Sequence, residues 1–365
     1  MNPVRSAVPA SPPQRDRSVV RPLTPPRARV LLAACVAAAL AASVFEIRQT
    51  PAPASSKVRT AAGDVALFRA VMARIRVGEP YHRAMASELG PRKYPTASVF
   101  NWRTPALYRA TASLPAEAVR AVLVSLGGLM LVSTIIALKG RSGVAMTAAL
   151  FLQVGAVVPV MVPSAPLLTE PWAGMFLGLS ICAYQLRMCR TAACIGLLAL
   201  FVRELAAPYV VVCAVLAIRR RRWTEVAIWT AGAVMYAAYY WWHLQEVQAL
   251  QQPGALAHAQ SWLYGGGPAF LLRTLRTNAW LLVSPTWLPA GSLLLAALIA
   301  ACLSGETAPL LRATVLTYLA LFLVVGQPFN DYWGLLTAPL WALASADGVN
   351  ALRGWAAMAG RRSAA

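Results

Sequence analysis

Residues 191–218 read TAACIGLLALFVRELAAPYVVVCAVLAI, an apolar run that is interrupted by Arg203, Glu204 and Pro208. Arginines bound this run on both sides, namely Arg187, Arg190 and the four residues from Arg219 to Arg222. Cytoplasmic loops of membrane proteins carry an excess of Lys and Arg, so both ends of the run are expected in the cytoplasm. A single crossing would separate the two ends, whereas a hairpin returns the chain to the same side. We therefore predict a hairpin with its turn near Arg203 and Glu204.

The arms of this hairpin are short. Each arm has about a dozen residues, or roughly 18 Å of helix, against a hydrocarbon core of about 30 Å. The turn is therefore expected at membrane depth, where broken backbone is tolerated only if it is buried in protein or lines a polar cavity. A charge at that depth is costly, at about 2.5 to 3.5 kcal/mol on insertion scales. Arg203 and Glu204 could be a buried pair that locks the turn, but we favour a function in substrate binding and catalysis.

The rest of the chain fits the same picture, because 58% of the residues are hydrophobic and only 13% are charged. The mean hydropathy is +0.57. These values predict an all-α polytopic membrane protein. The other expected spans are residues 30–45, 118–138, 143–162, 171–188, 224–242, 279–303, 308–326 and 334–352. Counting the hairpin as two gives about ten membrane helices, with both termini in the cytoplasm.

The domain organisation is simple. Residues 1–29 are rich in Pro, Ser and Arg and form an expected disordered basic tail in the cytoplasm. Residues 30–352 form one membrane-embedded domain, and residues 353–365 form a cytoplasmic C-terminal tail. The formal charge of +20 resides in short clusters between apolar runs, which indicate topology and anionic-lipid or phosphate contacts and argue against a nucleic-acid partner. The six cysteines lack metal-ligand spacing, and the histidines are scattered, so no metal site is predicted.

Residues 46–117 form a long first external loop. Within it, Val65, Phe68, Met72 and Ile75 recur at three- and four-residue spacing, which predicts a helix lying along the membrane surface. Gly78 and Pro80 are expected to end that helix.

Four acidic residues fall at the external ends of the predicted helices or at the hairpin turn, namely Asp64, Glu170, Glu204 and Asp331. We expect them to converge on one outward-facing cavity. Like Glu204, the acids Asp64, Glu170 and Asp331 could each have a purely structural role. Asp64 could be a helix N-cap, Glu170 could interact with a helix dipole, and Asp331 could be a turn residue.

Basic and aromatic side chains accompany these acids. Arg103 lies in the segment FNWRTP, whose rigid neighbours would hold its guanidinium for bidentate phosphate binding. Arg203, Lys93 and Arg273 are further candidate phosphate ligands, although single loop cations are usually only solvated. Aromatic rings that could stack on a sugar, or form an interfacial belt, are Tyr81, Trp102, Tyr332 and Trp333.

The order of four short motifs, with Asp64 ahead of them, resembles the GT-C class of integral-membrane glycosyltransferases. The motifs are GEPYH at residues 78–82, TEPW at 169–172, RELAAPY at 203–209 and NDYWG at 330–334. The resemblance implies a GT-C fold, a polyprenyl-phosphate sugar donor, a cavity open to the periplasm and inversion at the sugar carbon. By position, Asp64 matches the first-loop acid that takes the proton of the acceptor hydroxyl. Because Asp64 has no acidic neighbour, Glu170 and Glu204 remain alternative bases.

The expected function is therefore transfer of a hexose or pentose from polyprenyl phosphate to an external glycan, lipid or protein in a bacterial inner membrane. Fixed arginines on the leaving phosphate could make a metal cofactor unnecessary, although Glu170 and Glu204 could hold a divalent ion. One alternative is a transporter or flippase of a lipid-linked saccharide, because a broken hairpin could also line a transport path. A non-catalytic assembly subunit is the other alternative, and its charges should be scattered.

Overall fold

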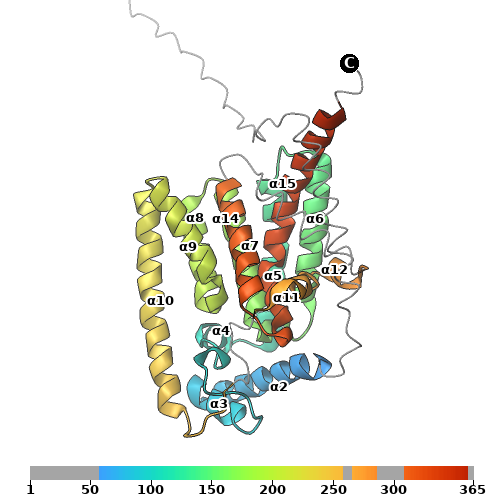
Figure 1. Cartoon of the computed structure of the whole chain (residues 1–365). Helices are drawn as coiled ribbons and strands as arrows, with labels where there is room; N and C mark the ends of the chain where they lie inside the picture. The colour runs from blue at the N-terminus through green and yellow to red at the C-terminus, as the bar shows by residue number, and fades with distance from the viewer. Residues whose placement is uncertain (1–56, 258–264, 286–307, 361–365) are drawn as a thin grey trace, which may run out of the picture.

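The computed structural model of the chain describes residues 57–257, 265–285 and 308–360. Within these ranges all regular secondary structure is helical, which confirms the all-α prediction. The predicted tail 1–29 and the predicted span 30–45 lie outside the described residues. Figure 1 shows a bundle of long helices with a layer of shorter helices across one end. The candidate site lies where this layer meets the bundle.

Helix α7 (Thr169–Gln185) forms the centre of the bundle, because almost all of its residues are buried. An apolar helix of this kind is expected in a protein interior. Its packing neighbours are α5 (Ala116–Ala137), α8 (Cys189–Val202) and α15 (Gly334–Gly360). Close packing against α15 depends on Gly174, where a methyl group would clash with the carbonyl oxygen of Leu335. This central position of α7 places Glu170, in its first turn, at the inner boundary of the helical layer.

The predicted hairpin is present. Helix α8 is followed by a short 3-10 turn, η4 (Glu204–Ala206), and by α9 (Ala207–Arg219). Arg203 has an extended backbone between the two helices, with φ −150° and ψ 120°, and Pro208 fits in the first turn of α9. In Figure 1 the outer ends of α8 and α9 lie at the same end of the bundle, and the turn points toward the layer of short helices.

The remaining long helices differ from the predictions mainly in length. They are α6 (Gly143–Val157, continued by η2, Val158–Met161), α10 (Trp223–Leu250) and α14 (Ala308–Val324). The predicted end of α10 at residue 242 is wrong, because the helix continues to Leu250. The aromatic run at residues 239–242 is typical of a membrane-interface belt at a helix end, but it lies inside the helix. Helix α15 likewise continues past residue 352 to Gly360.

Two helical segments are long and apolar enough to cross a membrane, Ala116–Ala137 and Gly143–Met161. Their outer faces are apolar and exposed, as shown by Val132, Ile136 and Phe151. Shorter apolar helices are Cys189–Val202 and Pro309–Val324. Of the span predicted at residues 279–303, the structure describes α12 (Ala279–Val283), and residues 286–307 lie outside the described ranges.

The layer at the end of the bundle contains α2 (Lys57–Arg76), α3 (Tyr81–Leu89), η1 (Val99–Asn101) and α4 (Ala106–Thr111). It has its own apolar core, in which Phe68 and Met72 pack with Leu67, Val71 and Met85. This arrangement confirms the amphipathic helix predicted from the spacing of residues 65–75. The helix ends at Arg76, and the following Gly78 has φ +94°, as expected for a residue that reverses the chain.

Candidate functional site

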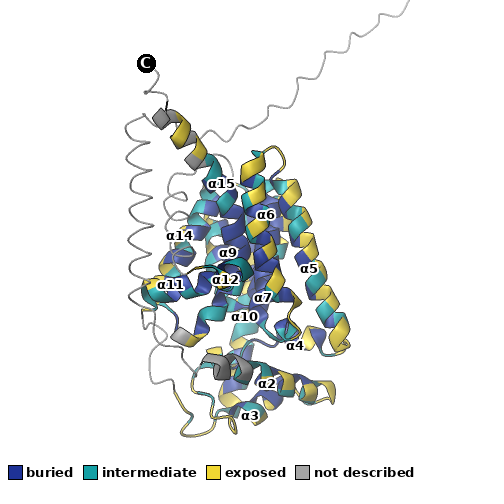
Figure 2. Cartoon of the chain, turned by 90° about the vertical axis from the view of Figure 1, so that its right-hand side faces the viewer, coloured by how far each residue is buried: buried dark blue, intermediate teal, exposed yellow. Residues whose placement is uncertain are grey.

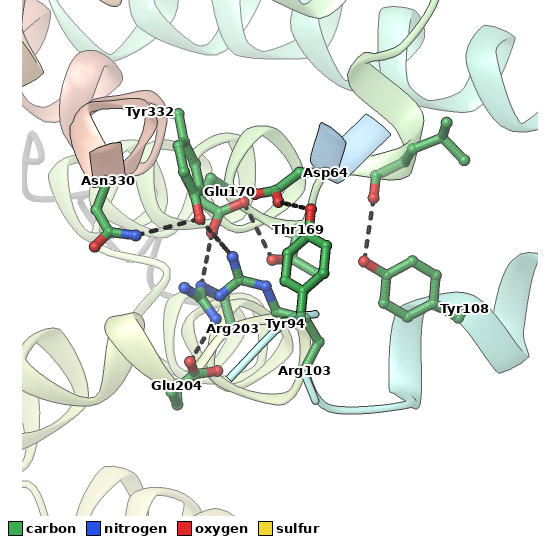
Figure 3. Close-up of polar contacts among 11 residues, drawn as sticks. Asp64, Tyr94, Arg103, Tyr108, Thr169, Glu170, Arg203, Glu204, Asn330 and Tyr332 are labelled. Atoms are coloured by element: carbon green, nitrogen blue, oxygen red, sulfur yellow. Dashed lines mark hydrogen bonds and ion pairs between the residues drawn. The ribbon is translucent and has the colours of Figure 1, made fainter. Parts of the chain in front are cut away.

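Charged residues from four separate parts of the chain meet where the α2–α4 layer contacts the bundle (Figure 3). They are Asp64 of α2, Arg103 between η1 and α4, Glu170 of α7, and Arg203 with Glu204 at the hairpin turn. Tyr332, from the 3-10 segment η5 (Pro328–Trp333), completes the group.

Arg203 is the most deeply buried cation of this group. Its side chain is only 2% exposed, and Glu170 is 1% exposed. The Nε atom of Arg203 lies 2.9 Å from Glu170 Oε1, although the two atoms lack the alignment of a hydrogen bond. A second guanidinium nitrogen of Arg203 donates a hydrogen bond to Glu204 Oε1. The extended backbone at the hairpin turn thus places one arginine between two carboxylates, as Figure 3 shows.

Arg103 approaches the same Glu170 from the α2–α4 layer. One of its terminal nitrogens lies 3.8 Å from Glu170 Oε1 and donates a 2.6 Å hydrogen bond to the hydroxyl of Tyr332. Glu170 is therefore shared between two arginines, and its other oxygen accepts a 3.3 Å hydrogen bond from Thr169. A role for Glu170 confined to the dipole of α7 does not account for these contacts.

The backbone of Arg103 is also unusual, with φ +53°. Lys93, Arg187 and Arg221 share this left-handed conformation, and each is at the end of a helical turn closed by a backbone hydrogen bond from its own N–H. At Arg103 the support comes from a side chain. The hydroxyl of Tyr81 donates to the carbonyl oxygens of Trp102, at 2.7 Å, and of Arg103, at 3.2 Å. Unfavourable backbone that is held by its surroundings is common at functional sites.

Asp64 faces the two arginines from α2. The hydroxyl of Tyr94 donates a 2.7 Å hydrogen bond to Asp64 Oδ1. Burial raises the pKa of Asp64 above its ordinary value, and the Tyr94 hydrogen bond and the charge of Arg103 only partly oppose this effect. The N-cap alternative for Asp64 is wrong, because α2 begins at Lys57 and Asp64 lies inside the helix.

A cavity of about 280 Å³ opens beside Asp64 and Arg103. This volume is slightly below the usual range for drug-sized ligands and suits a single sugar unit. Its polar lining residues are Asp64, Arg92, Lys93, Tyr94, Asn101, Arg103, Asn330 and Tyr332. Arg92 is paired with Glu88 at 3.0 Å. The cavity thus presents the carboxylate of Asp64, the paired cation Arg92 and two further cations, Lys93 and Arg103. This lining favours an anionic ligand.

The structure brings most of the predicted site residues together, but of the four acids that were expected to converge on one cavity only Asp64 lines it. Arg273 is in α11 (Gly267–Leu275) and is not among the residues that line the cavity. Asp331 belongs to η5 and does not line it either, although its neighbours Asn330 and Tyr332 do. Tyr81 is buried and positions Arg103 through its hydroxyl.

The two tryptophans considered as sugar-stacking faces are also buried. Trp102 belongs to the apolar core of the α2–α4 layer. Trp333 packs against Phe270 and Phe322 in the bundle.

Sequence reasoning missed several polar partners. Tyr94 is 30 residues from Asp64, and no periodicity links them. The histidines were predicted to be scattered, but His82 Nε2 lies 2.9 Å from His243 Nδ1 in a buried contact between α3 and α10. Among the residues that the structure describes, no group of three His, Cys, Asp or Glu side chains could hold a metal ion.

In comparisons with known proteins, no family model, curated protein or solved structure matches the chain.

Proposed function

We propose that the protein is a membrane glycosyltransferase that moves a sugar from a polyprenyl-phosphate donor to an acceptor outside the cytoplasm. The observation that carries this proposal is the arrangement of Asp64, Arg103 and Arg203 around Glu170, beside a cavity of about 280 Å³. A carboxylate base and two fixed guanidinium groups are the parts that displacement of a phosphate from a sugar requires.

A membrane location is supported by the outer surface of the bundle. Exposed apolar side chains occur on several of its helices, including Val132 of α5, Phe151 of α6, Val215 of α9 and Val234 of α10. Extended apolar surface of this kind is a feature of proteins that contact lipid or a partner. The proposal includes the predicted set of about ten membrane helices, with a GT-C-like arrangement, in a bacterial inner membrane.

The proposed orientation rests on the arginines of three short turns. Arg141, Arg187 and Arg222 belong to the α5–α6, α7–α8 and α9–α10 turns, and Figure 1 shows these turns at the end of the bundle away from the α2–α4 layer. Arg141 pairs with Asp347 of α15 at 2.8 Å, and Arg222 contacts the sulfur of Cys189, the first residue of α8, at 3.0 Å. The positive-inside rule assigns that end to the cytoplasm and the candidate site to the periplasm.

The proposed reaction assigns a separate role to each group. Arg103 and Arg203 hold the donor phosphate, which is a diester-like monoanion before reaction and a dianion after it leaves. Asp64 takes the proton from the acceptor hydroxyl as its oxygen attacks the anomeric carbon. The bond between that carbon and the phosphate oxygen breaks, its electron pair stays on the phosphate, and the sugar configuration inverts. The proton then passes from Asp64 to solvent through the cavity.

Asp64 suits the role of base better than the other carboxylates do. Glu170 and Glu204 each have an oxygen engaged by Arg203, and neither of them lines the cavity. Asp64 is hydrogen-bonded to a neutral side chain, Tyr94, and burial raises its pKa. A higher pKa makes the carboxylate a stronger base.

The test uses the full chain in proteoliposomes that contain a radiolabelled undecaprenyl-phosphate sugar and a bacterial membrane-lipid extract. We expect the wild type to release undecaprenyl phosphate and to label an acceptor. Asp64→Asn should lower the rate by about 10²- to 10⁴-fold. Asp347→Asn is the matched control, because it neutralises a buried carboxylate at the opposite end and should leave the rate unchanged. Full activity of folded Asp64→Asn would exclude Asp64 as the base.

The same preparation distinguishes the transporter alternative, which the polar hairpin turn also suits. A flippase would move the labelled donor across the bilayer with its sugar–phosphate bond intact. Accumulation of intact donor in the opposite leaflet, without release of undecaprenyl phosphate, would therefore favour transport over transfer.

A further inference from the structure

A second group of polar atoms lies near Arg203 and is not used in the proposed reaction. Glu204 bonds Arg203 through Oε1, but its Oε2 atom is buried and has no hydrogen-bond partner among the described residues. Within the same part of the chain, the buried hydroxyls of Tyr236 and Tyr240 have none either. Buried polar atoms in a native protein are nearly always hydrogen-bonded, so three unpaired atoms in one region call for an explanation. We call Glu204, Tyr236 and Tyr240 the Glu204 cluster.

The Glu204 cluster lies where the end of α8 and the hairpin turn meet α10. Tyr236 and Tyr240 are one turn apart on α10, and their ring centroids are 5.9 Å apart. The ring of Tyr236 also makes an edge contact with Phe201 of α8, at a centroid distance of 5.4 Å. Phe201 is three residues before Glu204, and α8 packs along α10. The unpaired atoms thus come from two neighbouring parts of the fold, the hairpin turn after α8 and the α8-facing side of α10.

A purely structural role does not require these hydroxyls. Tyr239, on the same helix, shows what a structural tyrosine does here: its hydroxyl accepts a 2.9 Å hydrogen bond from the backbone N–H of Ala106. Phenylalanine at positions 236 and 240 would make the same ring contacts without leaving a hydroxyl unpaired. The two hydroxyls are therefore better explained by a ligand that pairs with them.

The chemistry of the cluster indicates which ligand this is. The free oxygen of Glu204 can accept hydrogen bonds from hydroxyl groups but repels a phosphate. The phenolic hydroxyls can donate or accept, and the rings of Phe201, Tyr236 and Tyr240 offer an apolar surface for the C–H face of a pyranose or furanose. One carboxylate is too few ligands for a divalent cation. A ring that carries several hydroxyl groups satisfies all of these features.

We propose that the Glu204 cluster binds the sugar ring of the polyprenyl-phosphate donor and selects among sugars by their hydroxyl groups. This inference rests on the proposed glycosyl transfer. Because Glu204 is hydrogen-bonded to Arg203, a ring on the cluster lies next to a phosphate on the arginines, as the two parts of one sugar phosphate must. Glu204, predicted from sequence as a catalytic candidate, is thereby assigned to substrate recognition.

The test compares Tyr236→Phe and Tyr240→Phe with wild type in nanodiscs that contain the full chain. The donors are undecaprenyl-phosphate glucose, galactose, mannose and arabinose, and kcat/KM is measured for each. We expect the variants to lower kcat/KM for the preferred sugar by about tenfold, the effect of one lost hydrogen bond, and to change the others much less. The selectivity should fall by the same factor, while affinity for undecaprenyl phosphate without a sugar stays unchanged.

Two controls keep this result interpretable. The melting temperatures of Tyr236→Phe and Tyr240→Phe should equal or exceed that of the wild type, because neither hydroxyl has a protein partner. Tyr239→Phe loses a structural hydrogen bond on the same helix and should lower the melting temperature without changing the order of preference among sugars.

The outcomes separate this inference from the proposed function. If the wild type turns over the donors, Asp64→Asn is inactive and both tyrosine variants keep wild-type selectivity, the Glu204 cluster is not a sugar subsite and only this inference fails. If the wild type neither binds nor turns over any of the four donors, the proposed function fails and the inference fails with it. Loss of selectivity confined to the two tyrosine variants supports both.

Discussion

Buried ion pairs occur at both ends of the bundle, but they are built differently. At the end away from the α2–α4 layer, Arg141 pairs with Asp347 at 2.8 Å and joins the α5–α6 turn to α15. At the candidate site, Glu170 is shared by Arg103 and Arg203. Arg203 also bonds Glu204, so the two arginines and two carboxylates form a network. Because an arginine has five N–H donors, these arginines keep donors available for a ligand. A one-to-one pair holds helices together, whereas a shared carboxylate prepares two cations for a further anion.

The largest effect is expected at Arg203. Arg203→Met should abolish transfer, by about 10³-fold or more, because the phosphate loses a fixed charge partner. It should also lower the free energy of unfolding by about 3 to 5 kcal/mol, since Glu170 is left buried beside only the more distant Arg103. Thermal unfolding in detergent and the proteoliposome assay measure the two effects. The double variant Arg203→Met with Glu170→Gln should regain stability but not activity, and recovery of activity would show that Arg203 is only structural.

A smaller effect is expected at Arg103. Arg103→Lys keeps the positive charge but loses the planar fork that can hold two phosphate oxygens while donating to Tyr332. The rate should fall by about 10- to 100-fold, which corresponds to one or two strong hydrogen bonds in the transition state. Stability should change little. An unchanged kcat/KM would mean that Arg103 does not contact the donor phosphate.

At the end of the bundle away from the α2–α4 layer, a substitution should change stability and leave activity unchanged. Arg141→Gln removes the cation from the Arg141–Asp347 pair, in which the arginine side chain is 22% exposed. We expect a loss of about 1 to 2 kcal/mol in the free energy of unfolding, reduced by partial solvation, and no change in kcat. A fall in kcat at temperatures where the variant is fully folded would contradict the assignment of this end to structure alone.

The sequence alone predicts those features of the candidate site that depend on local patterns. Arginine clusters on both sides of one apolar run predict the α8–α9 hairpin, and the charges at its turn identify Arg203 and Glu204. The spacing of Phe68 and Met72 predicts α2. Each signal is contained within about 30 residues of chain.

Contacts between distant elements leave no such signal. Nothing local links Tyr94 to Asp64, or His82 to His243, because tertiary packing alone brings them together. The aromatic run before His243 resembles the end of a membrane helix, and α10 continues because its last two turns pack on α3. Asp64 has the local pattern of an N-cap after Gly63, but the helix begins at Lys57.

The smallest expected effect concerns the stability of Asp64→Asn. Burial raises the pKa of Asp64 from 3.8, against the opposing effects of Tyr94, Arg103 and Arg203. The folded protein therefore binds this proton more tightly than the unfolded chain does. Protonation of Asp64 therefore stabilises the folded protein. This contribution is fully present below the ordinary pKa and is lost as the pH rises through the raised pKa of the folded state.

Asparagine stays neutral at every pH and can still accept the hydrogen bond from Tyr94. The variant should therefore be more stable than the wild type at pH 7, by up to about 1 kcal/mol, and the difference should shrink as the pH approaches 4. Unfolding in detergent at pH 4, 5.5 and 7 measures this trend. Glu88→Gln is the reference, because the hydrogen bond from Arg74, with a second from Arg92, lowers the pKa of Glu88. That variant should lose stability at pH 7. If Asp64→Asn instead lost stability at pH 7 as Glu88→Gln does, Asp64 would belong with the structural ion pairs, and the difference between those pairs and the candidate site would not extend to this carboxylate.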